Sequence, residues 1–333
     1  MNIPTRERRV LIGAALASAG LALVPSAWAQ TRPKGKPIRL LVGFPPGQAT
    51  DIVARLLAER IRAVSGDNVI VENVAGQGGS LAMGQLAKAT PDGSVMMLSH
   101  MSAVATNPHI YKSVPYDSLR DFEAVSLIGD LPFVLVCNPT QPFTTLQGLI
   151  DFAKANPDKL THASSGNGTV SHLAMEEFKR KAGGLKITHI PYKGSALGLT
   201  DVMSGNVACA LETAAAVRPH VESGKLRALA AGSLSRLGGV LAHVPTLAEQ
   251  GIANFNASTW LMLLLPAGTH KAIVYAQFRE LEAVMRQPDV LPRLQAIGLQ
   301  PRASESPDEA DQYMRFEHKN WGEVVRRSGV VLE

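Results

Sequence analysis

Short runs of Val, Ile and Leu alternate with stretches of helical periodicity along most of the chain. Residues 38–42 form such an apolar run, and Leu56, Leu57 and Ile61 then recur at helical spacing within 51–64. Further strands are predicted at 68–72, 95–98, 133–136, 160–163, 187–190, 207–211, 226–230 and 260–265, and helices at 80–89, 145–156, 170–182 and through most of 271–325. Short apolar strands that alternate with helices are typical of parallel sheets in a layered α/β fold.

The strands fall into two groups of similar make-up, and no Pro/Ser-rich linker separates the groups. We therefore expect two α/β lobes joined by crossover strands, one formed by residues 30–131 and 260–333 and the other by 132–259. Ligands of open α/β sheets bind at the carboxyl ends of the strands. Two such lobes facing each other predict a ligand cleft between them.

The first 29 residues have the pattern of a cleavable signal peptide. A basic start around Arg8-Arg9 precedes an apolar run over 10–24, and Ala27-Trp28-Ala29 is a small-x-small cleavage site. The run is shorter than the about 20 residues that span a bilayer, so cleavage is favoured over an uncleaved anchor. The paired arginines fit a twin-arginine signal as well as a general secretory signal, and both routes stay open. Either route predicts a periplasmic protein.

The charge balance argues against nucleic acid as a partner. The 333 residues carry a formal net charge of +5, and 18% of them are charged. No dense Lys/Arg stripe with interleaved aromatic residues occurs, as a nucleic-acid surface would require. The mild excess fits either an ordinary basic surface or long-range attraction of an anionic solute.

The two cysteines, Cys137 and Cys209, both lie in apolar runs that are predicted to be strands. In an oxidising compartment they can pair if their Cα atoms lie within about 7 Å. Two separately buried free thiols is the interpretation we favour. Their count and spacing argue against a zinc site.

Three loops have the composition of anion-binding helix starts. They cover residues 44–51, 75–80 and 164–169, and each follows a predicted strand and opens a predicted helix. The small residues in them leave backbone N–H groups free at the helix start, where the helix dipole also favours negative charge. Such loops hold a carboxylate without any arginine. We expect at least two of the three to face a ligand.

Motifs for cofactors and catalysis fail when their spacing is checked. Leu81 stands where the last glycine of a dinucleotide fingerprint belongs, and Pro219 stands where the first glycine of a P-loop belongs. His172 and Glu176 make only half of a metal site, so His172 is better interpreted as a capping or interlobe hydrogen-bonding residue. No nucleophile elbow surrounds Ser165. We therefore expect no catalytic residue, no cofactor and no metal.

Ordered motifs over the whole chain resemble one family, the Bug-type (TctC-like) extracytoplasmic solute receptors of tripartite tricarboxylate transporters. The matching segments are Phe44-Pro45-Pro46-Gly47 with Asp51, Val71-Glu72-Asn73, Gly76-Gln77-Gly78-Gly79, Pro115-Tyr116-Asp117, Ser164-Ser165-Gly166-Asn167-Gly168-Thr169, Pro191-Tyr192-Lys193-Gly194, Gly224-Lys225-Leu226-Arg227, Pro245-Thr246-Leu247-Ala248-Glu249, Pro266-Ala267-Gly268-Thr269 and Trp321-Gly322.

The resemblance implies a type II periplasmic-binding-protein fold that closes on its solute. It further implies that backbone N–H groups and ordered water from the first and third loops hold one carboxylate. The contacts implied at matching positions are Gly47, Gln48, Ala49, Thr50, Ser165, Gly166, Asn167, Gly168 and Thr169, with Tyr192 and the region around Ser102 lining the walls.

Two departures from the family pattern affect the expected pocket. Gln48 and Ala49 stand where the first loop usually carries more glycine, which narrows the pocket and adds an amide. Glu212 follows the strand predicted at 207–211, and its carboxylate either pairs with a ligand ammonium or is solvated. Amino acids, dicarboxylates, aromatic acids and uncharged solutes therefore all stay open as ligands.

The class that these observations favour is a monomeric solute-binding protein for a small carboxylate, which delivers its solute to the membrane subunits of a transporter. One alternative is a receptor that presents its closed form to a sensor kinase. A secreted enzyme using the same cleft is a further alternative. A cytoplasmic regulator is disfavoured, because a signal peptide stands where a DNA-binding helix-turn-helix would be needed.

Overall fold

The computed structural model describes residues 35–328. The signal peptide predicted for residues 1–29 lies outside the described residues. No helix in the described part is long and apolar enough to cross a membrane.

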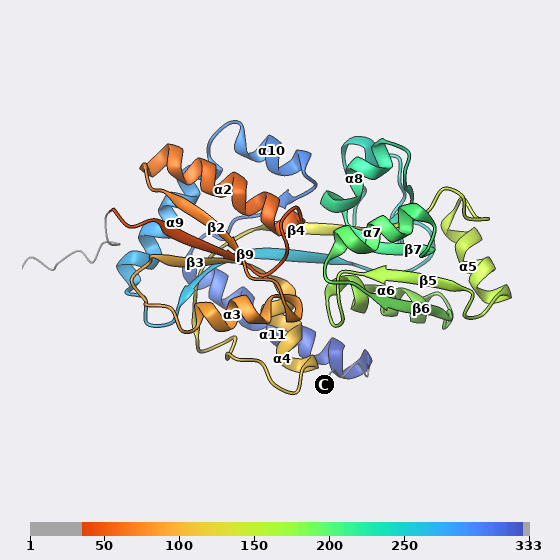
Figure 1. Cartoon of the computed structure of the whole chain (residues 1–333), viewed down its shortest axis with the longest axis horizontal. Helices are drawn as coiled ribbons and strands as arrows, with labels where there is room; N and C mark the ends of the chain where they lie inside the picture. The colour runs from red at the N-terminus through yellow and green to blue at the C-terminus, as the bar shows by residue number, and fades with distance from the viewer. Residues whose placement is uncertain (1–34, 329–333) are drawn as a thin grey trace, which may run out of the picture. The chain divides into compact units, whose positions relative to one another are not determined.

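The first half of the sheet is built from three parallel strands (Figure 1). Strand β1 (Ile38–Val42) lies between β2 (Val69–Asn73) and β3 (Val95–His100). Helix α2 (Ala49–Ser65) connects β1 to β2, and α3 (Ser80–Leu86) follows β2 after a short 3₁₀ turn. The bounds of these strands and helices agree with the predicted ones to within a few residues, and their order is that of βαβ units.

A second group of parallel strands repeats this arrangement. Strand β5 (Leu160–Ser164) lies between β6 (Ile187–Pro191) and β7 (Cys209–Thr213). The remaining elements of this part are α5 (Leu146–Ala155), α6 (Val170–Lys181), α7 (Ser195–Ser204), α8 (Ala214–Glu222) and β8 (Arg227–Ala231).

Two long antiparallel strands connect the groups, and Figure 1 shows them side by side. Strand β4 (Phe122–Cys137) pairs with β9 (Ser258–Pro266) and then continues to pair with β7 and β8. One ten-stranded sheet results, with the path β2-β1-β3-β9-β4-β7-β5-β6. The crossover strands and the layered α/β class are thus confirmed, whereas the lobe boundaries stay a prediction.

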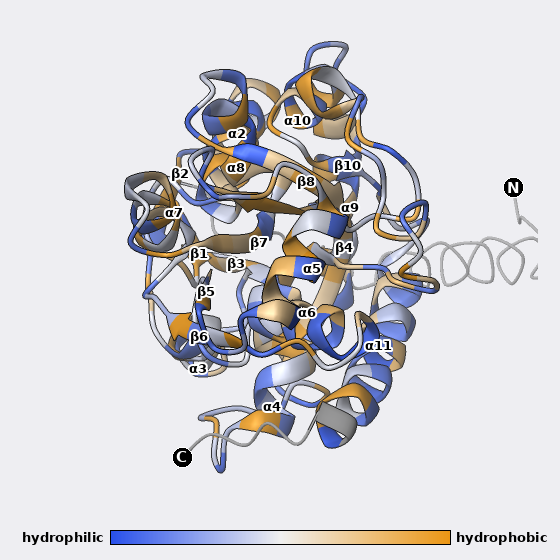
Figure 2. Cartoon of the chain, turned by 90° about the vertical axis from the view of Figure 1, so that its right-hand side faces the viewer, coloured by the Kyte–Doolittle hydropathy of each residue, from blue (hydrophilic) through white to orange (hydrophobic). Residues whose placement is uncertain are grey.

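The C-terminal part is helical, as its pattern predicted. It contains α9 (Lys271–Met285), α10 (Val290–Ala296) and α11 (Pro307–Ser328), with the short strand β10 (Gln300–Pro301) pairing with β4. Helix α11 is largely hydrophilic in Figure 2, and its buried residues include Ala310 and Met314. This distribution is typical of a helix that packs along one stripe.

Most strands agree with their predicted bounds to within two residues, and two of the differences affect the crossover and the pocket. Strand β4 is much longer than the predicted 133–136. The prediction missed its first part because Gly129, Asp130 and Pro132 interrupt the apolar pattern that indicates a strand. This stretch pairs regularly with β9, and the bulges precede it, where the register shifts between Ala124 and Ser126 and between Leu127 and Gly129. Strand β7 extends to Thr213, so Glu212 lies within the strand rather than after it.

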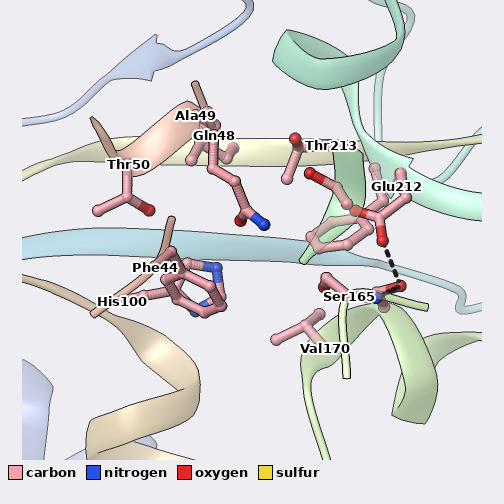
Figure 3. Close-up of a pocket in the computed structure, with 13 residues that line it drawn as sticks. Phe44, Gln48, Ala49, Thr50, His100, Ser165, Val170, Glu212 and Thr213 are labelled. Carbon is pink, nitrogen blue, oxygen red and sulfur yellow. Dashed lines mark hydrogen bonds between the residues drawn. The ribbon is translucent and has the colours of Figure 1, made fainter. Parts of the chain in front are cut away.

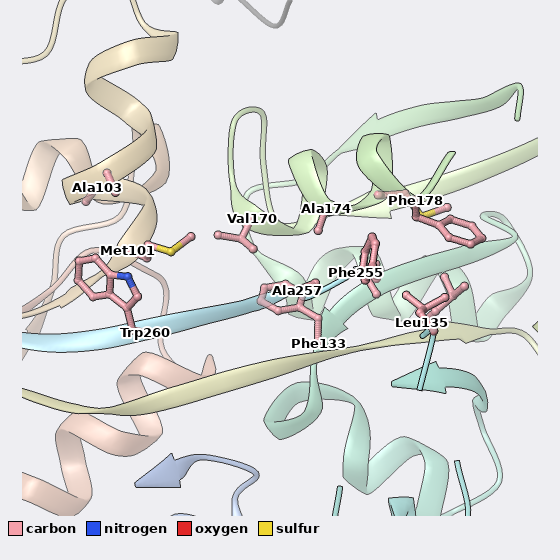
Figure 4. Packing of buried hydrophobic residues seen from close by; sticks show 14 of the residues in the cluster. Met101, Ala103, Phe133, Leu135, Val170, Ala174, Phe178, Phe255, Ala257 and Trp260 are labelled. Carbon is pink, nitrogen blue, oxygen red and sulfur yellow. The ribbon is translucent and has the colours of Figure 1, made fainter. Parts of the chain in front are cut away.

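Aromatic side chains mark the core on both sides of the crossover (Figure 4). Phe133, Phe178 and Phe255 pack together on the face covered by α6, and Trp260 of β9 lies further along the same cluster. The indole nitrogens of Trp260 and Trp321 both donate to one carboxylate oxygen of Glu317, at 2.9 and 3.1 Å. Glu317 therefore fastens α11 to the crossover strand.

Replacement of Glu317 by Ala leaves the buried Trp260 N–H without an acceptor. We expect the free energy of unfolding in urea to fall by about 2–4 kcal/mol, because hydrogen bonds to a charged group contribute about 1.5–3 kcal/mol each. Glu317→Gln retains an acceptor oxygen and should lose less. Equal losses in the two variants would show that the indole hydrogen bonds contribute little.

Candidate ligand-binding site

One pocket lies where the two strand groups approach each other, and Figure 3 shows its lining. The residues that line it are Phe44, Gln48, Ala49, Thr50 and His100 from the first group, Leu131 and Phe133 from β4, and Ser165, Val170, Ser171, Ser195, Glu212 and Thr213 from the second group. Both the α2 and the α6 N-terminus contribute to this lining, and it contains no Lys or Arg.

The α2 N-terminus leaves backbone donors open at the pocket. Gln48 is the N-cap residue in extended conformation, and its side chain makes no capping bond. Asp51 instead accepts from the Gly47 N–H at 2.9 Å and from the Asn73 amide at 2.9 Å. Within the described residues, no acceptor is found for the N–H groups of Ala49 and Thr50. These two donors are free to meet a ligand.

Asp51 does not cancel the positive end of α2. Burial opposes its ionisation, but hydrogen bonds from Arg55, Gly47 and Asn73 and the Arg55 charge hold the pKa of its carboxyl below the usual range. Its charge is thus already paired with Arg55 at 2.9 Å. The dipole of the 17-residue helix remains available to an anion.

The loop before α6 uses its own N–H groups internally. Ser165 N–H donates to Ser171 Oγ at 3.3 Å, Gly166 N–H to Ser164 Oγ at 3.2 Å, and Gly168 N–H to His172 Nδ1 at 3.1 Å. The N–H groups without an acceptor belong to the next residues along the chain, at the start of α6. Thr169 is the N-cap residue of α6, and its hydroxyl donates to the Gly166 carbonyl at 2.7 Å instead of capping the helix. No described residue accepts from the N–H groups of Val170 and Ser171.

Of the twelve contacts expected from the sequence, five line the pocket, namely Gln48, Ala49, Thr50, Ser165 and Glu212. Outside that lining are Gly47, Ser102, Gly166, Asn167, Gly168, Thr169 and Tyr192. Val170 and Ser171 were missed, although their place as the first two residues of α6 was a signal that they would carry free donors. Phe44, His100, Leu131, Phe133, Ser195 and Thr213 are the other lining residues that were not anticipated.

Glu212 is a buried acid of the pocket, with a relative exposure of 3%. The alternative of a solvated carboxylate is therefore wrong. Its Oε1 accepts from the Ser171 hydroxyl at 2.8 Å. Burial raises the pKa of Glu212 to about 7, although hydrogen bonds from Ser171, Thr213 and Ser165 act in the opposite direction. A carboxyl of this kind changes its charge near neutral pH.

Three stacked imidazoles pack beside the loop at residues 164–169. His172 accepts the Gly168 N–H and stacks on His189 with ring centroids 3.9 Å apart, and His189 stacks on His162 at 4.8 Å. Burial lowers the pKa of His172 to about 4 and that of His189 to about 3, so both rings are neutral. The neutral ring allows His172 Nδ1 to accept, which agrees with the capping interpretation. The described residues hold no group of three or more potential ligands that could bind a metal ion.

Two contacts join the strand groups beside the pocket. The Thr106 hydroxyl donates to the Gly168 carbonyl at 3.2 Å. A Cβ at Gly194 would lie 2.0 Å from the Gln48 amide nitrogen, and Gly194 has a φ of +118°. Gln48 therefore packs directly against the backbone that starts α7, at a place where only glycine leaves room.

Two α/β halves joined by crossover strands, with open helix N-termini at a shared pocket, define a solute-binding protein. The profile of the TctC family, described as tripartite tricarboxylate transporter family receptor, matches residues 53–330. The chain belongs to this family. It is a family of periplasmic solute-binding proteins and not of enzymes.

Individual relatives agree with this placement. BugT of Bordetella pertussis is 37% identical over 324 residues, covering 97% of this chain and 98% of that protein. The structure of Rpa4515 from R. palustris with adipate superposes with a TM-score of 0.85 at 30% identity and covers 90% of this chain and 99% of that one. MatC from Rhodopseudomonas palustris with bound malate gives a TM-score of 0.79 at 26% identity, over 88% and 99% of the two chains. The periplasmic-binding-protein fold predicted from the resemblance is thereby confirmed.

Glu212 makes stability depend on pH in a defined direction. Its folded pKa of about 7 lies above its unfolded value near 4.5, so its contribution is present at low pH and is lost as pH rises from about 4.5 to 7. The quantity to compare is the difference in free energy of unfolding between the unsubstituted protein and Glu212→Gln. We expect this difference to fall by about 3 kcal/mol as pH rises over this interval. Urea unfolding at several pH values measures the difference.

The subtraction cancels the buried histidines, whose depressed pKa values act in the opposite direction below pH 6.5. A difference that does not change with pH would mean that Glu212 titrates normally.

Proposed function

We propose that the protein captures a carboxylate-bearing solute in the periplasm by closing its two halves on it. It then delivers the solute to the membrane subunits of a tripartite tricarboxylate transporter. The observation that carries the proposal is the pair of open helix N-termini, α2 and α6, at one pocket. The signal peptide directs the protein to the periplasm and is then cleaved after Ala29.

Backbone donors and helix dipoles are the source of affinity in this proposal. The lining contains no basic side chain, so the charge of a carboxylate is compensated by the N–H groups of Ala49, Thr50, Val170 and Ser171. Helix α2 has 17 residues and α6 has 12, and the N-terminus of each carries a partial positive charge. Because the donors come from both halves, one carboxylate binds the halves together and favours closure. The adipate and malate seen in two relatives have the matching chemistry.

Besides the carboxylate, Glu212 restricts which second group the solute can carry. It is the one acidic residue of the lining, and its carboxyl lies beside the α6 start through its bond to Ser171. A second solute carboxylate placed against an ionised Glu212 would be repelled. We infer that the solute group nearest Glu212 is a hydrogen-bond donor, either an ammonium or a hydroxyl.

Val170→Pro tests the backbone donors. Proline has nearly the volume of valine, lacks the N–H, and is favoured at the first position of a helix. The extended Thr169, with ψ of 163°, is compatible with a following proline. Calorimetry with the tightest-binding acid from a panel that includes adipate and malate should show a Kd raised about tenfold or more.

Val170→Ala is the matched control, because it removes more side chain but keeps the N–H. The melting temperatures of both variants report whether the fold is intact. If the alanine variant loses as much affinity as the proline variant, the donor hypothesis is wrong.

The Glu212 requirement is tested with solutes that differ in one group: succinate, malate and aspartate. We expect the donor-bearing acids to bind more tightly than succinate, and Glu212→Gln to reduce that preference by about tenfold. Titrations at pH 6 and pH 8 separate ammonium from hydroxyl recognition, because ionisation of Glu212 adds an ion pair for the ammonium but only strengthens a hydrogen bond for the hydroxyl. A preference that Glu212→Gln leaves unchanged would contradict this inference.

A further inference from the structure

Cys137 and Cys209, which the sequence places 72 positions apart, are opposite each other in the sheet. They are register partners on the antiparallel strands β4 and β7. Both are fully buried, and both thiols are free in the structure. The expectation of two buried free thiols agrees with the structure, which adds that the two residues face each other as one cross-strand pair.

The hydrogen-bond pattern shows which kind of pair this is. Just beyond the ends of β4 and β7, the Asn138 N–H donates to the Ala208 carbonyl at 3.4 Å, so the backbone of Asn138 faces the β7 side. The backbone of Phe133 points to the other side of β4, where its carbonyl accepts from Gly232. Since pairs alternate along an antiparallel ladder, Cys137 and Cys209 form a non-hydrogen-bonded pair.

Non-hydrogen-bonded partners have the geometry that a disulfide needs. Their Cα atoms lie about 4.5 Å apart, within the range of about 4.4–6.8 Å found in disulfides, and their side chains project from the same face of the sheet. Both cysteines belong to the core cluster on the α6 face, together with Leu135 and Leu211. In the reduced structure the Cys209 thiol donates to the Thr161 carbonyl at 3.6 Å, so formation of the bond requires this side chain to turn toward Cys137.

We propose that Cys137 and Cys209 are oxidised to an intramolecular disulfide during folding in the periplasm. Each thiol gives up its proton, the two sulfurs form one S–S bond, and the two electrons pass to the disulfide of a thiol–disulfide oxidoreductase, which is released as a dithiol. The proposal rests on export of the chain but is independent of which solute is bound.

The timing follows from burial. Burial raises the pKa of the Cys137 thiol to about 11 and also raises that of Cys209, so neither forms a reactive thiolate once the core has closed. Oxidation therefore takes place while the chain is still accessible to the oxidant. The native sheet then protects the bond from reduction.

The bond would close a loop that contains most of the second strand group. Residues 138–208 include α5, β5, α6, β6 and α7, and thus the helix whose N-terminus lines the pocket. A cross-link over a loop of this length restricts the unfolded chain strongly. The disulfide stabilises the half of the molecule that carries the Val170 and Ser171 donors.

The test uses the full chain, exported by a bacterial host and quenched in acid. Proteins are denatured, treated with N-ethylmaleimide without reductant, digested and analysed by mass spectrometry. We expect a linked peptide pair containing Cys137 and Cys209, with neither residue labelled, and labelling of both after reduction. The Cys209→Ala variant should show one labelled thiol and no linked pair.

A second readout compares the melting of this preparation with that of a sample that has been unfolded, reduced and refolded in the presence of reductant. The reduced protein has the same sequence and packing, so we expect its melting midpoint to be several degrees lower. Labelling of both cysteines in the exported, unreduced protein would overturn the proposal. A link between two chains instead of within one, detected on a non-reducing gel, would overturn it as well.

Discussion

Backbone N–H groups at the start of a helix have no partner within the helix, and this constraint organises the site. Most proteins satisfy such donors with side-chain caps or water. Here the N-caps of α2 and α6, Gln48 and Thr169, make no side-chain capping bond, and both helix starts line one pocket. A carboxylate is the ligand that satisfies these donors and the helix dipoles together.

The surrounding structure keeps these donors open. Asp51 is turned back onto Gly47, Arg55 and Asn73, and the loop before α6 is held by Ser164, Ser171 and the neutral His172. The long strand β4 pairs with strands of both groups and contributes Leu131 and Phe133 to the pocket lining. These side chains decide which N–H groups remain available at the pocket.

Local pattern predicted much of this fold, and tertiary pairing explains where it failed. The strand at 38–42 and the helix after it were predicted closely, since apolar periodicity alone determines them. Most of β4 was missed because bulges before Gly129 conceal its alternation. The donors of Val170 were missed because the capture of Gly168 N–H by His172 depends on the folded loop. Likewise, the register of Cys137 with Cys209 is set by the sheet and leaves no trace in the sequence.

Ligand-induced stabilisation tests the central claim most directly. The mature protein, from Gln30 onward, is stripped of solute by unfolding and refolding, and its melting temperature is recorded against mono-, di- and tricarboxylates, amino acids and uncharged analogues. A ligand at about 100 times its Kd adds about 2.7 kcal/mol and raises the midpoint by several degrees. The account predicts such a shift for a small set of related carboxylates and none for their amides. Stabilisation by an amide equal to that by its acid would contradict the assignment of the α2 and α6 N-termini as a carboxylate site.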